Sequence, residues 1–111
     1  GLDSHHMPDR SADPRVSIND GPAIQMDPWD HRKTSSWGSS RDATEYRRQT
    51  AEMIAEGKYR DAMAREVRDA RNAAYKGSGD RTKYNEAVRE MLDYARRSGQ
   101  LPPKPPRTPS K

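Results

Sequence analysis

The sequence predicts an α+β domain in which two short strands and one helix are followed by about three further helices. Residues 1–40 are rich in Pro, Asp, Gly and Ser, and they contain short apolar alternation typical of strands. Residues 41–98 are rich in Ala, Arg and Glu, with apolar residues three and four positions apart, which is typical of amphipathic helices. Residues 99–111 are Pro-rich and basic, and we expect them to form a disordered tail.

The composition allows one small domain. The chain has 111 residues, of which 34% are charged; it lacks Phe, and Leu, Ile and Val together number nine. Chains of this composition often stay disordered, so any core is small and is built from Ala, Met, Tyr and Trp. We expect such a core to need a bound metal or a partner protein.

Charge and cysteine content restrict the functional classes. A net charge of +4 favours nucleic acid or an acidic protein as a partner, although many unrelated proteins are equally basic. The absence of cysteine excludes disulfides and thiolate metal sites. No apolar run is long enough for a signal peptide or a membrane span. If the protein is exported, we expect an N-terminal delivery region that is absent from this chain.

Two strands are expected before the first helix. Ile24–Met26 alternates like a strand, and Ser4–Met7 is its expected partner. The connection from Pro8 to Asp20 is long, with Val16 and Ile18 as apolar anchors, and it ends in the turn signal Asn-Asp-Gly-Pro.

The first helix is expected from Pro28 to about Trp37. Asp27 fits its N-cap, Pro28 its first position, and Asp30 the acidic position of a capping box. This places His31 in the first turn of a helix that directly follows a strand. We expect Trp29 and Trp37 to be core anchors for this helix rather than platforms for base stacking.

Three further helices are expected at about 42–56, 58–76 and 80–97, separated by glycines and with Asp80 capping the last. Each carries an apolar face, and the clearest is the third. Its face consists of Tyr84, Ala87, Val88, Met91, Leu92 and Ala95.

All three histidines lie within residues 5–31. Neighbouring residues of a strand point to opposite faces, so in the pair His5-His6 one ring can bind a metal while the other activates water. Phosphodiester hydrolysis needs a general base near neutral pH and a cation that offsets charge on the phosphate. His31 can complete a metal site, and the start of its helix favours phosphate.

These residues carry a resemblance to a known family. Ser4-His5-His6, followed by Gly21-Pro22-Ala23-Ile24-Gln25-Met26 and Asp27-Pro28-Trp29-Asp30-His31, resembles the SHH group of HNH/endonuclease VII superfamily nuclease toxin domains. The resemblance covers about residues 3–37. It implies a small ββα-metal (His-Me finger) unit in residues 1–40, with the helical residues 41–98 as an extension of the same domain.

The resemblance also implies roles for individual residues. His6 would be the general base, and His5 and His31 would bind a divalent metal, with Mg²⁺ expected first and Mn²⁺ or Zn²⁺ as alternatives. Asn19 is the nearest candidate for the Asn that orients the base. Ser35 stands where some relatives have a further metal-binding His, so water, phosphate, or a carboxylate such as Asp30 or Asp3 would complete the site. Arg32 and Lys33 would hold the phosphate backbone.

The family consists of C-terminal effector domains of secreted bacterial polymorphic toxins. The resemblance therefore implies a metal-dependent endonuclease that cleaves DNA in the cytoplasm of a target cell after delivery by the producing bacterium. It also implies a cognate immunity protein, which we expect to be acidic.

Three alternatives stay open. Gly-Leu-Asp-Ser-His-His-Met resembles the remnant of a purification tag, which would remove His5 and His6 from consideration. The chain would then be a non-enzymatic helical interaction module with an N-terminal tag and linker. The third alternative keeps the site but changes the substrate to RNA, because a base and a metal attack phosphodiesters without reading the sugar.

Overall fold

A computed structural model describes residues 1–15 and 20–104 of the chain. It confirms the α+β class: a two-stranded antiparallel sheet is combined with four α-helices and one short 3-10 helix within these residues. The elements in chain order are β1 (Asp3–His6), η1 (Arg10–Ala12), β2 (Ala23–Met26), α1 (Pro28–His31), α2 (Arg41–Ala55), α3 (Tyr59–Ser78) and α4 (Asn85–Arg97).

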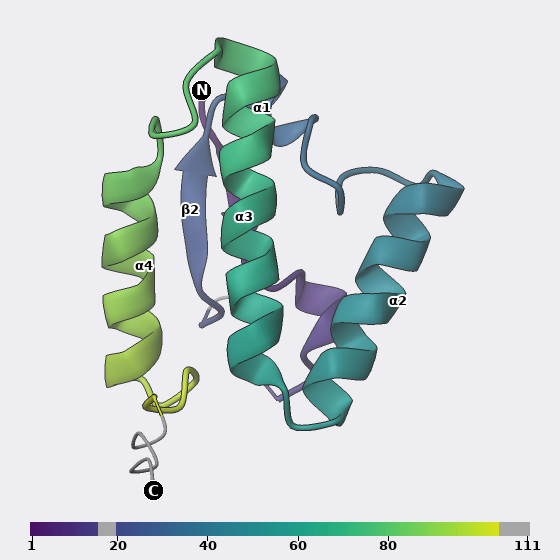
Figure 1. Cartoon of the computed structure of the whole chain (residues 1–111), viewed down its shortest axis with the longest axis vertical. Coiled ribbons are helices and arrows are strands. Elements are labelled where there is room, and N and C mark those ends of the chain that lie inside the picture. The colour runs from purple at the N-terminus through teal and green to yellow at the C-terminus, as the bar shows by residue number, and fades with distance from the viewer. Residues whose placement is uncertain (16–19, 105–111) are drawn as a thin grey trace, which may run out of the picture.

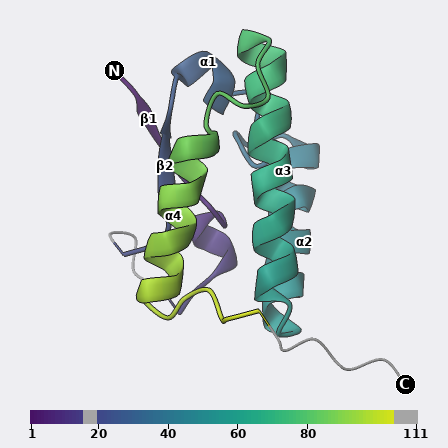
Figure 2. The ribbon, with the colours of Figure 1, turned by 60° about the vertical axis from the view of Figure 1, so that its left-hand side comes forward.

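Helix α3 lies at the centre of the molecule. In Figure 1 it runs between β2 and α4 on one side and α2 on the other, and Figure 2 shows α4 lying over the sheet. The short α1 packs against α3 and also contacts β1, while α2 packs against η1 and α3. The sheet and α1 are therefore held between the longer helices.

The hairpin places alternate residues of β1 in the interior. His5 pairs with Ile24 and Asp3 with Met26, and beyond the strand the Met7 amide donates to the Pro22 carbonyl at 2.9 Å. His5, Met7, Ile24 and Met26 are buried, whereas Ser4 and Gln25 are exposed, as the period of two in a strand requires. Both expected strands are confirmed, each shifted by one residue at its start.

The core is built mainly from methionine, alanine and tyrosine. Met7, Met26 and Met63 are almost completely buried and meet small residues of α3 such as Ala70 and Ala74. Unbranched methionine side chains fill irregular gaps, which suits a chain with few Leu, Ile and Val residues.

Helix α1 ends at His31, so the expected helix to Trp37 is wrong. The Thr34 hydroxyl donates to the His31 carbonyl at 2.8 Å, and the Ser35 amide donates to the Asp69 carboxylate of α3 at 2.8 Å. Side-chain hydrogen bonds of this kind compete with the helical pattern, and the tie to α3 turns the chain away from the helix axis.

Two other helix boundaries differ from the expectation. Helix α3 continues through Gly77 to Ser78, and Gly79 ends it with a φ of +77°, a backbone conformation that favours glycine. Helix α4 begins at Asn85 rather than at residue 80. Asp80 instead accepts the Thr82 amide at 2.8 Å in the turn before the helix.

Both tryptophans are half-exposed, so the prediction that they are core anchors is wrong. Trp29 is 54% exposed and Trp37 is 47% exposed. The inner face of the hairpin is instead occupied by Met7, Ile24 and Met26, which belong to the buried core.

Several expected features fall outside the described residues. The anchors Val16 and Ile18 and the candidate Asn19 belong to the segment 16–19, and the end of the chain from residue 105 is also outside. Before that point Leu101 is 5% exposed and belongs to the core, and Arg60 donates to the Pro102 carbonyl at 2.8 Å.

Candidate metal and catalytic groove

The order β1, β2, α1 brings two of the three histidines together. His5 lies in the buried position of β1, and His31 is the last residue of α1. The centroids of their rings are 5.1 Å apart, with the ring planes inclined at 61°. The positions of His5 and His31 in the sequence predicted that these two rings would lie close together.

A groove of about 590 Å³ runs past both rings. His6 also lines it, so all three histidines of the chain border one space. The other walls come from η1 and its approach, from the loop after α1, and from Arg47 of α2. These walls include Asp9, Arg10, Ser11, Ser36, Trp37 and Gly38.

His31 is oriented by a carboxylate. Its Nδ1 lies 3.0 Å from Oδ2 of Asp3, two residues before His5 on β1. A carboxylate oxygen accepts hydrogen bonds, so Nδ1 is the donor in this contact and Nε2 is the ring nitrogen that points away from Asp3. Carboxylates orient metal-binding imidazoles in this way in many proteins, and the contact with Asp3 fixes the orientation of the His31 ring.

His5 is a neutral imidazole with an unsatisfied nitrogen. Burial, reinforced by the neighbouring His31 ring, lowers the pKa of His5 from 6.5 to about 4, against a smaller opposing effect of Asp9. Within the described part of the chain, the buried Nε2 of His5 has no hydrogen-bond partner. A buried polar atom without a partner is costly, and a cation is one group that would satisfy a neutral imidazole nitrogen.

The described residues offer two imidazoles rather than a full set of ligands. Among residues 1–15 and 20–104, no group of three or more His, Asp or Glu side chains is placed to hold a metal ion. Ser35, which the resemblance placed at a possible metal-binding position, is bound to Asp69. The residues present fit a cation held by His5 and His31, with water and phosphate oxygens as the remaining ligands.

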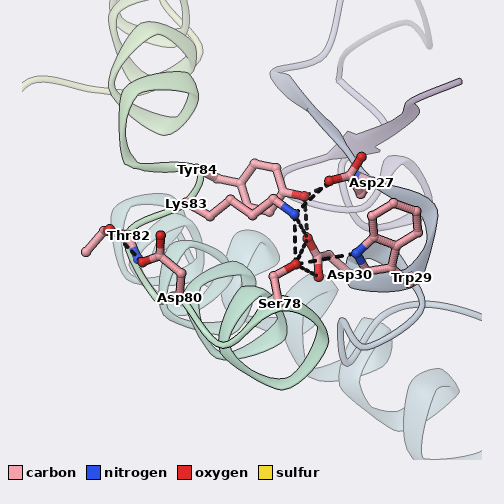
Figure 3. Close-up of polar contacts among 8 residues, drawn as sticks. All are labelled: Asp27, Trp29, Asp30, Ser78, Asp80, Thr82, Lys83 and Tyr84. Carbon is pink, nitrogen blue, oxygen red and sulfur yellow. Dashed lines mark hydrogen bonds and ion pairs between the residues drawn. The ribbon is translucent and has the colours of Figure 1, made fainter.

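Asp30 serves the fold instead of the groove. Its carboxylate is fully buried and accepts hydrogen bonds from Ser78 Oγ at 2.7 Å, Lys83 Nζ at 2.8 Å and Tyr84 OH at 2.6 Å (Figure 3). Burial alone would raise the pKa of Asp30, but these three donors outweigh it and hold the pKa below its usual value. Asp30 is therefore neither a capping-box residue nor free to bind a metal ion in the groove.

The same cluster engages Asp27, the residue before α1. Its carboxylate lies 2.6 Å from Lys83 Nζ, and its amide donates to Tyr84 OH at 2.9 Å. Asp27 occupies the N-cap position as expected, but its side chain makes no capping hydrogen bond. Lys83 and Tyr84 thus fasten both ends of α1 to the turn between α3 and α4, as Figure 3 shows.

Two basic residues in the groove were missed by the sequence analysis. Arg10 lies in η1, and Arg47 reaches the groove from α2, where Nη1 donates to the carbonyls of Ser36 at 2.6 Å and Gly38 at 2.7 Å. Arg47 is 16 residues from His31, and Arg10, although close to His6 in sequence, reaches the groove through the short helix η1, so local spacing carries no signal for either. The expected phosphate ligand Arg32 lines a neighbouring groove instead, and Lys33 is exposed on the surface.

Comparisons with protein-family models, curated proteins and solved structures find no match for this chain. In the described ranges, no helix combines the length and the apolar character needed to cross a bilayer. The functional argument therefore depends on the groove itself.

Proposed function

We propose that this chain is a metal-dependent nuclease domain that hydrolyses phosphodiester bonds, with DNA as the substrate. One observation carries the proposal: His5 and His31, from a hairpin and the helix that follows it, lie 5.1 Å apart beside a groove that His6 also borders. The order of the elements and the positions of the histidines agree with a ββα-metal unit.

The chain's own groups account for binding and proton transfer. His5 and His31 hold the divalent ion, with Mg²⁺ first and Mn²⁺ or Zn²⁺ as alternatives; when bound, the ion supplies positive charge that offsets the negative charge of the phosphate and the leaving oxygen. His6 accepts a proton from a water molecule whose oxygen attacks phosphorus, and the bond between phosphorus and the leaving oxygen breaks. Arg10 and Arg47 border the same groove and favour a polyanion there.

The biological setting follows from the resemblance in residues 3–37. The domain would be the C-terminal effector of a secreted bacterial polymorphic toxin, acting in the cytoplasm of the target cell. A cognate immunity protein would protect the producer, and the net charge of +4 suits an acidic partner.

The rival interpretation is a non-enzymatic helical module that follows a tag and linker. It treats the first forty residues as external to the fold, yet His5 is 3% exposed and Met7 fully buried, and β2 packs against α4. Those contacts favour the interpretation that the N-terminal strands are part of the folded domain rather than of a tag and linker. The same site acting on RNA is the remaining alternative, because neither His6 nor the paired rings distinguish the sugars.

A supercoiled plasmid tests the proposal. We expect nicking with Mg²⁺, Mn²⁺ or Zn²⁺, none in EDTA, and a loss of about 10²–10⁴-fold in rate for His6→Ala. Gln25→Ala, an exposed position on β2, is the matched control and should cleave like the parent.

Circular dichroism and thermal unfolding would show whether each variant folds. Equal cleavage by the parent and by a folded His6→Ala variant would show that His6 is not the base. Absence of cleavage of both plasmid and an RNA transcript by the folded parent would favour the non-enzymatic module.

A further inference from the structure

A second groove adjoins the histidine groove. It encloses about 760 Å³ between the loop after α1 and the first half of α2, and Arg32, Tyr46 and Gln49 are among its walls. Trp37 and Gly38 line both grooves, so the two spaces adjoin along this segment. A polymer in the histidine groove that continued past Trp37 would enter the second groove.

Trp37 is an exposed indole on an anchored loop. Trp37 is 47% exposed, although tryptophan is usually more deeply buried. Arg47 binds the carbonyls on both sides of it, those of Ser36 and Gly38, and the Asp69 carboxylate accepts the Ser35 amide. The exposed residue that borders both grooves is therefore carried by a backbone that is tied to α2 and α3.

Charges of both signs line this path, because Asp9 in the histidine groove and Asp42 and Glu45 in the second groove accompany three arginines. Arg10 and Arg47 border the histidine groove and Arg32 borders the second one. Of the acidic residues in the second groove, Glu45 is already paired, because Arg48 binds its two carboxylate oxygens at 2.9 and 2.7 Å. Asp42, in the first turn of α2, is the other acidic residue of that wall.

Trp29 provides an internal comparison. It is equally exposed, but its ring faces Lys83, whose ammonium lies 5.6 Å from the ring centroid, and its Nε1 donates to Ser78 Oγ at 3.4 Å (Figure 3). The described residues that line the two grooves do not include Trp29. Exposure alone therefore does not make an indole part of this path.

We propose that Trp37 stacks against an unpaired base next to the scissile phosphate, and that the second groove is the subsite for that nucleotide. The position of the scissile phosphate rests on the proposed nuclease function. Aromatic side chains in basic grooves bind single strands in this way, because every base offers a π-face. In a duplex the neighbouring bases cover these faces, so the preferred substrate is single-stranded or locally unpaired.

Two single-tryptophan variants test this subsite. In Trp29→Phe all tryptophan fluorescence comes from Trp37, and in Trp37→Phe it comes from Trp29, since the chain has two tryptophans. Each is titrated with oligothymidylate in EDTA, where no cleavage is expected. We expect strong quenching in Trp29→Phe, little in Trp37→Phe, and binding about tenfold weaker for Trp37→Ala than for Trp29→Ala.

Further titrations compare oligouridylate and a blunt DNA duplex. Similar quenching by the two single strands would mean that the subsite does not distinguish the sugars. A preference for one strand would assign the substrate. Both results agree with the proposal. Equal quenching by the duplex, or no selective quenching of Trp37 while plasmid is still nicked, would overturn the subsite and leave the nuclease intact. Selective quenching without any nuclease activity would keep the subsite and contradict the proposed hydrolysis.

Discussion

Glu66 is a buried acid on α3 whose ionisation opposes folding. It is 1% exposed, and within the described residues its Oε1 has no hydrogen-bond partner. Burial, with contributions from nearby Asp69 and Asp9, raises the pKa of Glu66 from 4.5 to about 7. The folded protein therefore keeps a proton that the unfolded chain loses between pH 4.5 and pH 7.

We expect this group to make the protein less stable as pH rises. Its favourable contribution is complete below pH 4.5 and is lost by about pH 7, a change of about 3 kcal/mol in the free energy of unfolding. Glu66→Gln should lack this decline. Urea unfolding of both proteins at pH 4.5 and 7.5 in EDTA measures the difference.

The difference between the free energies of unfolding of the parent and Glu66→Gln separates the effect of Glu66 from that of His5. The lowered pKa of His5 acts in the opposite sense, because its contribution is present above pH 6.5 and is lost as pH falls to about 4. That contribution is common to both proteins and cancels. An identical pH dependence for the parent and Glu66→Gln would show that Glu66 ionises as it does in the unfolded chain.

Asp3 is the residue through which the proposed metal site can be tested, because it contacts His31. Removing the carboxylate in Asp3→Ala frees the ring that the 3.0 Å hydrogen bond holds. We expect divalent-metal affinity to fall by about 10- to 100-fold, as measured by calorimetry with Mn²⁺. Asp61→Ala, an exposed acid on α3, should bind like the parent. Equal Mn²⁺ affinities of the Asp3 and Asp61 variants would show that Asp3 does not contribute to metal binding.

Among the elements, α1 depends most on its surroundings. It contains four residues, too few to be stable alone, and the Asp30 cluster fixes it against α3 and the turn before α4. Gly77 of α3 permits this approach. A Cβ at Gly77 would overlap Oδ1 of Asp30 and lie 3.0 Å from the Asp30 Cα.

The sign of the effect of Gly77→Ala tests this packing. Helix propensity alone would stabilise the protein by about 1 kcal/mol. Because three donors hold the Asp30 carboxylate and its backbone is also close, we instead expect destabilisation by about 1–3 kcal/mol in urea unfolding. A more stable Gly77→Ala protein would mean that α1 does not pack closely on Gly77.

Local sequence patterns predicted the presence and type of the strands and helices better than the residues at which they end. The alternation at Ile24–Met26 and the apolar face from Tyr84 to Ala95 depend on neighbours in the sequence, and both are confirmed. The length of α1 depends on Asp69, which is 34 residues from Ser35 and has no local signature. The burial of Asp30 likewise depends on partners 48–54 residues away.

For the whole molecule, the sequence anticipated the histidines but not the groove around them. The pairing of β1 with β2 and the helix that follows β2 bring His5 and His31 together. Arg10, Arg47 and the exposed Trp37 reach the groove through the packing of η1 and α2, which depends on the tertiary arrangement. The two described tryptophans are exposed because methionines fill the small core.

The central claim is that one divalent cation binds between His5 and His31, beside His6. The chain has three histidines, so its imidazole proton NMR signals can be assigned with His5→Ala, His6→Ala and His31→Ala. Substoichiometric Mn²⁺ should broaden the signals of His5 and His31 together, and EDTA should restore them. Signals of His5 and His31 that stay sharp, or that broaden at different Mn²⁺ concentrations, would contradict a shared metal site.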